Sequence, residues 1–319
     1  YFCRSAEGLE CYAVGTALER AFASIFIIVL GYFLKRVGLF GKDDYDVAAK
    51  ICMNVTLPAA IITGFGSYEQ DYSLFIVVLL GALCNAAMIA AAWFITARSA
   101  RKERIFQLFA LPGYQIGTFT LPYIGGILGP YGILVTCMFD MGNALFACGG
   151  TYAIVSASPA VEGAERLPVK ELIKRVFSTV PFLIYIIAMV WVSLGLTVPG
   201  WLLVLAAPIG AANALVAMFM IGMMIEIRLG RGELAAASAT LAIRYAVSAA
   251  LALFLYFCTP FPLVIRQVLA LVVFSPVSAL APIFTARCGG DIGLAGFAGS
   301  ISIILSIAAM TVCMMLMGI

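Results

Sequence analysis

The stretches GTFTLPYIGG (117–126) and FSPVSALAP (274–282) decide the fold of this chain, because each places a proline inside a long apolar segment. A proline within a helix removes one backbone hydrogen bond and clashes with the preceding turn. In lipid, such a defect is tolerated only where the freed backbone faces protein or a water-filled cavity. The two stretches therefore predict two interrupted helices, broken around Pro122 and Pro276, whose breaks lie inside the protein.

The composition is that of an integral membrane protein. Hydrophobic residues make up 64% of the 319 residues, charged residues make up 11%, and the mean hydropathy is +1.09. Soluble domains are closer to half apolar and a quarter charged. Membrane-spanning β-strands would be short and would alternate polar with apolar residues, whereas LFIVVLLGALCNAAMIAAAWFITA (74–97) shows no alternation. The predicted fold class is therefore all-α and integral to the membrane.

Ten apolar segments of the sequence are long enough to cross a bilayer as helices, since each crossing needs about 20 residues. We predict four parts: a polar N-terminal arm (1–16), helices 1–5 (17–156), a cytoplasmic linker (157–169) and helices 6–10 (170–319). The ten predicted spans are residues 17–38, 45–66, 72–97, 104–128, 131–156, 170–196, 201–226, 234–257, 263–286 and 290–316.

Basic residues are concentrated in the loops on one side of these spans. Cytoplasmic loops carry an excess of lysine and arginine, so the basic side is predicted to be cytoplasmic, with both termini on the other side of the cell membrane. The opposite loops hold only Arg4, Arg20 and Arg266. The loops after the odd-numbered helices hold Lys35, Arg36, Lys42, Lys50, Arg98, Arg101, Lys102, Arg104, Arg166, Lys170, Lys174, Arg175, Arg228, Arg231 and Arg287.

Five spans in each half give the halves opposite orientations in the membrane. The predicted architecture is therefore two inverted five-helix repeats, with helices 4 and 9 broken and crossing. Interrupted helices at corresponding positions of two inverted halves are typical of secondary transporters, which bind substrate at the interruptions and work by alternating access. The matching positions of Pro122 and Pro276 are the basis of this interpretation.

Several motifs resemble the auxin efflux carrier family. They are GYFLKRVGLFGKDDYDVAAKICMNVTLPAAIITGF (31–65), GTFTLPYIGGILGPYGI, FDMGNALF, and the region from Pro276 through ARCGGD to Asp291. The resemblance extends over nearly the whole chain. It implies ten helices in two inverted repeats, with helices 4 and 9 unwound near the membrane centre. It also implies transport of a small organic anion, which is auxin in plants and malate, malonate or similar carboxylates in bacteria.

The sequence departs from the family pattern at three positions of the interrupted helices. Gln115 stands where the family usually has asparagine, Thr120 replaces a glycine, and Leu280 replaces a polar residue. Gly117, Pro122, Pro276 and Asp291 match the pattern. The substitutions keep the interruptions but change the hydrogen-bonding groups beside them, so they bear on the substrate and not on the architecture.

The unwound backbone suits an anion with hydrogen-bonding groups. Half-helix N-termini carry partial positive charge, and freed carbonyl groups suit a cation or a donor on the substrate. Serine and threonine also satisfy broken backbone in any kinked membrane helix, so a purely structural role is the alternative for each hydroxyl. The candidate substrate-binding residues are Gln115, Gly117, Thr118, Thr120, Pro122, Ser275, Pro276 and Ser278, together with Asn54 and Asn143.

Two charged residues stand out because they lie deep within predicted spans. Asp140 and Asn143 are three residues apart and lie on one face of helix 5, whereas Arg244 lies deep in helix 8. Ionisable groups inside a membrane are functional candidates because their placement there is costly. We expect Asp140 either to carry a coupled proton or to form an ion pair with Arg244, and a pair that only fixes packing is the alternative.

The sequence also argues against several kinds of site. It has no histidine, which is the usual titrating group near neutral pH and a common metal ligand. Its nine cysteines have no metal-ligand spacing. Most are interpreted as small hydrophobic residues, and Cys3 and Cys11 in the outward arm are candidates for a disulfide. With no phosphate-binding loop, catalytic triad or nucleic-acid-binding patch in the sequence, we expect no enzyme, no metal and no cofactor.

Two classes of function remain at this point. The first is a carrier of a small organic anion, with a proton as the candidate coupling ion. A sodium-coupled symporter of the bile-acid type is the alternative carrier. The second class is a membrane receptor that keeps the fold without transporting. The expected partners are the substrate and the lipid bilayer, and a homodimer through Gly125-x-x-x-Gly129 is weighed against internal packing of the same glycines.

Overall fold

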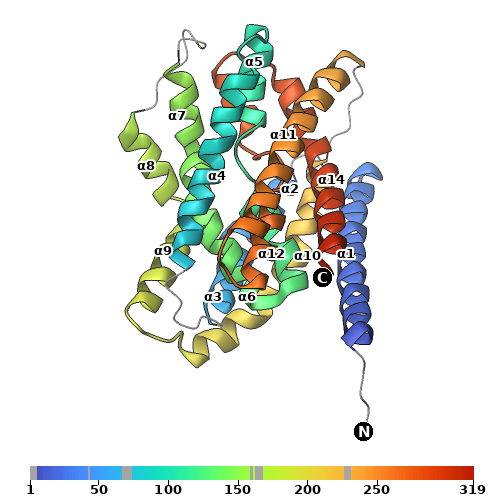
Figure 1. Ribbon diagram of the computed structural model, residues 1–319, viewed down its shortest axis with the longest axis vertical. Helices are drawn as coiled ribbons and strands as arrows, with labels where there is room; N and C mark the ends of the chain where they lie inside the picture. The colour runs from blue at the N-terminus through green and yellow to red at the C-terminus, as the bar shows by residue number, and fades with distance from the viewer. Residues whose placement is uncertain (1–5, 42–43, 67–73, 159–160, 162–167, 226–230) are drawn as a thin grey trace.

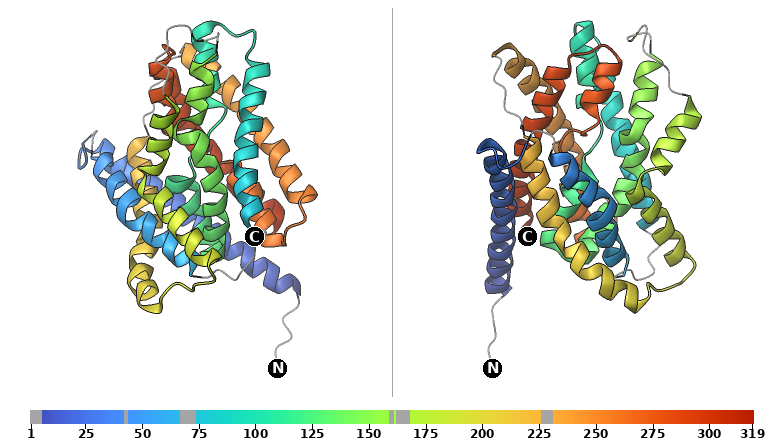
Figure 2. Two further views of the ribbon diagram at one scale, coloured as in Figure 1. Left: turned by 90° about the vertical axis from the view of Figure 1, so that its left-hand side faces the viewer. Right: turned by 180° about the vertical axis from the view of Figure 1, so that it is seen from behind.

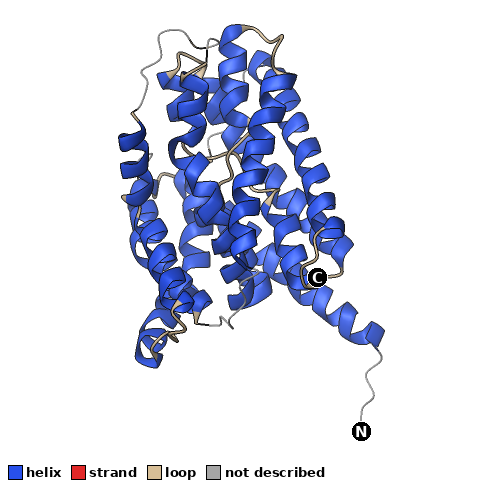
Figure 3. Ribbon diagram, turned by 60° about the vertical axis from the view of Figure 1, so that its left-hand side comes forward, coloured by secondary structure: helices blue, strands red, loops and turns tan. Residues whose placement is uncertain are grey.

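The computed structural model describes residues 6–41, 44–66, 74–158, 161, 168–225 and 231–319, and within them the regular elements are all helical (Figures 1 and 3). Six helical stretches are long and apolar enough to cross a membrane. They are Tyr45–Phe65, Leu74–Ile95, Ile116–Ser156, Gly200–Met224, Leu234–Cys258 and Ile292–Met317. The chain therefore has the character of a multi-pass membrane protein, and the count of ten spans stays a prediction.

The helices of the first half follow the predicted spans closely. Helix α1 begins within the predicted polar arm. Cys3 of the arm and Lys42 of the following loop lie outside the described residues, and so does the side chain of Cys11. The elements are α1 (Ala6–Arg36), α2 (Tyr45–Ile51), η1 (Cys52–Thr56), α3 (Leu57–Phe65), α4 (Leu74–Ile95), α5 (Arg101–Ala110), η2 (Ile116–Thr120), α6 (Leu121–Leu145), η3 (Phe146–Gly150) and α7 (Thr151–Ser156), where η denotes a π-helix.

The second half contains a similar series of long and short helices. These are α8 (Val169–Phe177), α9 (Val180–Ser193), α10 (Gly200–Met224), α11 (Arg231–Cys258), α12 (Leu263–Val272), α13 (Ala281–Arg287) and α14 (Ile292–Met317). Seen from behind, α1 stands upright at one edge of the helical body, whereas in the side view it slants away from the other long helices (Figure 2). The start of α5, with Arg101 and Lys102, lies at the end of the molecule opposite the start of α1 (Figure 1).

Two helices are interrupted, as the prolines predict, and the second break contains Pro276 as expected, but the first break lies before Pro122. Helix α5 ends at Ala110 and helical structure resumes at Ile116, while α12 ends at Val272 and α13 begins at Ala281. Pro122 is the second residue of α6, not the point of interruption, and Pro282 has the same place in α13. A proline is tolerated in a first helical turn because its missing N–H matters little there. The breaks themselves contain Pro112 and Pro276.

The sequence Thr-Leu-Pro occurs twice, and the threonine of each copy is the last residue of a π-helix. Leu57 donates its backbone N–H to the carbonyl of Cys52, and Leu121 donates to the carbonyl of Ile116, so each bond spans five residues. A proline one residue later cannot supply the ordinary bond to the preceding turn. The widened turn is thus the local form that the helix takes next to each proline.

Glycine allows the closest helix contacts in the described residues. A Cβ added at Gly142 of α6 would lie 2.0 Å from the carbonyl oxygen of Val78 in α4. A Cβ at Gly222 of α10 would lie 2.1 Å from the carbonyl oxygen of Ile28 in α1. Small residues let membrane helices approach until their backbones touch. The pairs α4–α6 and α1–α10 are therefore held by backbone-to-backbone packing.

The substitution Gly142→Val is expected to destabilise the protein. A side chain there would collide with rigid backbone, and overpacking of this kind costs about 1–3 kcal/mol. We expect a lower thermal midpoint in detergent, measured by tryptophan fluorescence. Gly296→Val is the control, because a Cβ at Gly296 meets nothing within 4 Å. Equal midpoints for the two variants would contradict the close α4–α6 contact.

The outer surface is strongly apolar. Large side chains such as Phe94, Phe257 and Leu316 are 81%, 70% and 83% exposed. Soluble monomers rarely expose large contiguous apolar patches, so this surface fits contact with lipid.

The motif Gly125-x-x-x-Gly129 does not extend along one helix face, because Gly129 has a φ of 67° and reverses the chain within α6. A Cβ at Gly125 would lie 2.7 Å from Ile133 Cγ1, so this glycine serves internal packing.

Candidate functional site

The two interruptions lie against each other inside the helical body, where Figure 3 shows loop segments between the helices and not only at their ends. We call Leu111–Gln115 and Val273–Leu280 the paired breaks. Tyr114 and Val277 form an antiparallel β-bridge, and Gln115 N donates to the carbonyl of Pro276 at 3.1 Å. Two segments from opposite halves of the chain thus satisfy part of each other's freed backbone.

The side chain of Arg244 joins the paired breaks. It projects from α11, is fully buried, and donates through Nη2 to the carbonyls of Gly113 (2.9 Å), Ser275 (2.9 Å) and Pro276 (3.1 Å). Through Nη1 it donates to the carbonyls of Ala110 (3.0 Å), Leu111 and Pro112 (3.4 Å). One guanidinium group therefore contacts carbonyls of both breaks.

Among the described residues, the charge of Arg244 is matched by helix dipoles and not by a carboxylate. The last carbonyls of a helix lack intrahelical partners and carry partial negative charge. Arg244 binds such carbonyls at the end of α5 and in the chain that follows α12. Its guanidinium carbon also lies 5.4 Å from the ring centroid of Tyr114, a favourable cation–π distance.

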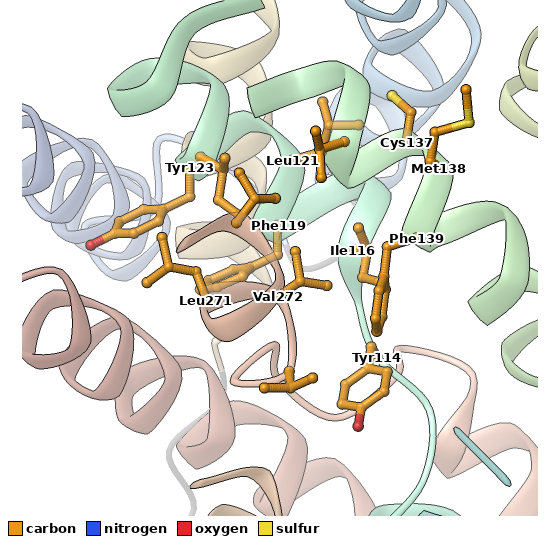
Figure 4. Packing of buried hydrophobic residues seen from close by; sticks show 14 of the residues in the cluster. Tyr114, Ile116, Phe119, Leu121, Tyr123, Cys137, Met138, Phe139, Leu271 and Val272 are labelled. Atoms are coloured by element: carbon orange, nitrogen blue, oxygen red, sulfur yellow. The ribbon is translucent and has the colours of Figure 1, made fainter. Parts of the chain in front are cut away.

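Asn143 of α6 holds the backbone of Tyr114 from the other side. Its Oδ1 accepts from Tyr114 N at 3.2 Å, and its Nδ2 donates to the Tyr114 carbonyl at 2.9 Å. Asn85 of α4 adds a bond to Asn143 Oδ1 at 3.1 Å and accepts from Gly113 N at 3.1 Å. The two amides thereby hold the first break in place, and the ring of Tyr114 packs against Phe139 (Figure 4).

Asp140 does not pair with Arg244, so the predicted ion pair is wrong for this structure. Asp140 Oδ1 accepts from Asn143 Nδ2 at 2.8 Å, and Oδ2 accepts from the hydroxyl of Tyr185 at 3.0 Å. The two terminal nitrogens of Arg244 already donate to backbone carbonyls, which sequence reasoning could not identify as partners. The carboxyl group of Asp140 instead lies beside Gly117, where an added Cβ would be 3.4 Å from Oδ2.

Hydroxyl groups form a second connection between the paired breaks and the half-helices next to them. Thr120 Oγ1 and Ser275 Oγ are 2.6 Å apart, and both side chains are fully buried. Gln115 Nε2 donates to Thr118 Oγ1 at 3.2 Å, and Thr118 is half-buried. Ser278 is also half-buried and accepts from Leu280 N at 3.4 Å. The structure thus brings together five of the residues that the sequence analysis proposed for substrate binding: Gln115, Thr118, Thr120, Ser275 and Ser278.

Asn54 is separated from this group. Its side chain is exposed and donates to the carbonyl of Lys50 at 2.9 Å, within its own helical segment. The inward-facing polar residue of this segment is Thr56, which donates to Asn213 Oδ1 at 2.9 Å.

Sequence reasoning also missed Tyr185, the partner of Asp140. It is the single tyrosine of the predicted span 170–196, and that isolation is the signal that could have identified it.

Comparison with known proteins gives a distant similarity. No protein-family model matches the chain. A region of 134 residues is 26% identical to an uncharacterized transporter from Methanothermobacter thermautotrophicus, covering 40% of this chain. The match spans 43% of the length of that relative. Among the described residues, no group of three or more histidine, cysteine, aspartate or glutamate side chains could hold a metal ion.

Proposed function

We propose that the protein is a secondary transporter of a small organic anion, with its substrate site at the paired breaks. The observation that carries the proposal is the meeting of two interrupted helices, one from each half of the chain, at Tyr114 and Val277. Interrupted helices at a repeat interface are the usual place for substrate in such carriers. The similarity to a transporter over part of the chain supports the same class.

The two breaks are supported in equivalent ways, which favours inverted repeats. Tyr114 N in the first break donates to Asn143 of α6, the predicted fifth helix. Val277 N in the second break donates to Ser302 Oγ of α14 at 3.0 Å, and α14 is the predicted tenth helix. In each half, the last long helix thus supplies a side-chain acceptor to the bridged residue. Two repeats of five spans, 17–156 and 170–319, are the architecture that this pattern favours.

An anionic substrate fits the electrostatics of the paired breaks. Arg244 contributes a permanent positive charge next to Gln115 and Ser275, whose neighbouring groups are neutral hydrogen-bonding side chains. Thr118 and Ser278 are the half-buried hydroxyl groups that a bound carboxylate would meet first. The proposed substrate class is therefore a small carboxylate, of the malate or malonate kind or an auxin-like acid.

The coupling ion is proposed to be a proton. In sodium-coupled carriers, freed carbonyls and half-helix C-termini coordinate the ion, but here Arg244 already occupies carbonyls of both breaks. Asp140 is a carboxyl group within the membrane-spanning part, held by Asn143 and Tyr185. It is the proposed proton carrier, in the cell membrane with both termini on the non-cytoplasmic side. A sodium-coupled bile-acid carrier is the less favoured alternative.

Counterflow exchange in proteoliposomes tests the proposal. Vesicles loaded in turn with malate, malonate, an indole acid and a bile acid would face the same labelled compound outside, with sodium and then with choline. We expect saturable exchange of one carboxylate, unaffected by sodium. The Thr120→Val variant, which removes the bond to Ser275, is expected to reduce the rate about tenfold, the effect of roughly 1.4 kcal/mol.

The control for this experiment is Ser193→Ala in α9. Ser193 is exposed and bonds only within its own helix, to the carbonyl of Met189, so the variant should exchange at the wild-type rate. Strict dependence on sodium would support the bile-acid type of carrier instead. If folded protein exchanged none of the four compounds, the receptor alternative would replace the proposed function.

A further inference from the structure

A groove of about 510 Å³ lies between α1 and α14, which stand next to each other at one edge of the helical body (Figures 1 and 2). Ile28 of α1 and Ile307 of α14 are buried and form its floor. Val29 and Ile304 are 55% and 49% exposed and form its rims. The volume is within the range of small-molecule sites, and the groove opens onto the apolar surface that fits contact with lipid.

The wall of this groove offers almost no polar group to a ligand. Apart from Tyr32 at one end and Thr311, its lining residues are isoleucine, valine and alanine. The hydroxyl of Thr311 is already bonded to the hydroxyl of Tyr123 at 2.9 Å and donates to the carbonyl of Ile307 at 2.7 Å. A small anion would lose its hydration against such a wall without compensation, whereas a hydrocarbon chain fits it.

Two basic side chains stand at the end of the groove that Tyr32 and Ile225 line. Arg36 is exposed, and its guanidinium carbon lies 5.9 Å from the ring centroid of Tyr32, so a residue of the wall holds this charge at the mouth of the groove. Lys35 Nζ donates to the carbonyls of Met223 at 2.7 Å and Ile225 at 3.4 Å. One end of an apolar groove therefore carries positive charge.

The sequence beside this end is also basic on balance. The residues that follow Ile225 include Arg228 and Arg231 against the acid Glu226. Basic clusters at the end of a membrane helix attract anionic lipid headgroups, and the planar donors of arginine match the oxygens of a phosphate. We infer that the groove holds an acyl chain of an anionic phospholipid, whose headgroup phosphate binds Arg36.

The dimensions of the groove agree with this occupant. From Ile25 to Tyr32, α1 rises by about 10 Å, and Arg36 lies about 6 Å further along the same helix. An acyl chain on the floor thus ends in a headgroup at the level of Arg36. Ala308 of α14 lines the groove and is exposed, so open space remains above it for the chain. This binding goes beyond the proposed function, because it needs no transported substrate.

A second copy of the protein fits this face less well than a lipid does. Two copies related by an axis along the membrane normal would present the same surface to each other. Arg36 of one copy would then lie at the same level as Arg36 of the other, and like charges repel. An anionic lipid instead brings a negative charge to each arginine.

Photocrosslinking locates the lipid. The purified protein in detergent would be mixed with phosphatidylglycerol that carries a diazirine on one acyl chain, irradiated, digested and mapped by mass spectrometry. We expect labelled peptides from residues 25–32 of α1 and 304–312 of α14. Phosphatidylcholine with the same chain, which has no net charge, should label these peptides several-fold less. Label confined to other helices, or equal labelling by the two lipids, would overturn the inference.

The variant Arg36→Gln tests the headgroup contact. Each basic side chain near an anionic lipid contributes about 1 kcal/mol, so the affinity for phosphatidylglycerol should fall about fivefold in a native mass spectrometry titration. Arg287→Gln is the matched control, because Arg287 is also an exposed arginine in the last turn of a helix but does not line the groove. Equal affinities in the two variants would contradict the assignment of the phosphate to Arg36.

The variant Ala308→Phe tests the acyl-chain contact without changing any charge. The added ring fills part of the groove and should remove most of the labelling of α1 and α14. Ala87→Phe makes the same change at an exposed position of α4 that lines no part of this groove, so it should keep the labelling. Unchanged labelling in folded Ala308→Phe protein would refute the chain position. Disulfide-linked dimers formed readily by Ala308→Cys in membranes would assign the face to a second copy instead.

Discussion

Replacing Arg244 with alanine is expected to produce the largest loss of stability of any single side-chain truncation in this protein. The guanidinium donates to carbonyls of Ala110, Gly113, Ser275 and Pro276, among others, and all of these are buried. Without it, two negatively polarised helix ends lie near each other with no positive charge between them. Removing one side of such a buried charged network costs about 3–5 kcal/mol.

The effect is measured as the thermal midpoint and the monodisperse fraction in detergent. Arg266→Ala is the matched control, because Arg266 also lies over a tyrosine ring, at 5.6 Å, but donates to the single carbonyl of Tyr256. Arg244→Lys should be intermediate, since lysine keeps the charge but loses the planar set of donors. In carrier assays, methylguanidinium added to Arg244→Ala is expected to restore part of the exchange. Equal midpoints for the two alanine variants would contradict this role.

Asn143→Leu is expected to have the second largest effect. The leucine leaves both the N–H and the carbonyl of Tyr114 unpaired and removes a donor to Asp140. Each buried polar group left without a partner costs about 1–3 kcal/mol. Because hydrogen bonds in one network strengthen one another, the loss of Asn143 also weakens the bonds of its neighbours. We expect a clearly lower thermal midpoint and loss of carboxylate exchange.

Asn54→Leu is the informative comparison for Asn143→Leu. Sequence reasoning grouped the two asparagines, whereas the structure places Asn54 on the exposed side of its segment with one local bond to Lys50. The Asn54 variant should therefore keep the wild-type thermal midpoint. If both variants lowered the midpoint equally, the separation of Asn54 from the paired breaks would be in error.

Apolar runs and prolines predicted much of the helical framework. Runs of 20 or more apolar residues can hardly form anything but helices in a bilayer, and every predicted span contains helix. The prolines identified the correct two helices, but Pro122 was misread as the break. A proline in a first turn and a proline in an interruption look alike in sequence, and only the partners of the neighbouring carbonyls distinguish them.

The contacts at the paired breaks were less accessible to sequence reasoning. From a sequence, the partner of a charged residue is sought among charged side chains, so Arg244 was matched with Asp140. Backbone carbonyls such as those of Leu111 and Ser275 were not considered. Tyr185 and Asn213 come from helices far along the chain from their partners. Their roles depend on how helices are rotated against each other, which the apolar character of their neighbours does not reveal, because these helices are apolar on nearly all sides.

The long sequence separation between Arg244 and the carbonyls that it binds also constrains the order in which the protein can assemble during synthesis. The carbonyls of Ala110, Leu111 and Gly113 precede Arg244 by 134, 133 and 131 residues. During synthesis, the first half emerges well before the donor that these carbonyls need. The first interruption must therefore stay hydrated, or be covered by another factor, until α11 has been inserted. A nascent chain that stops before residue 244 has Asn85 and Asn143 to hold the first break but lacks the donor for these three carbonyls.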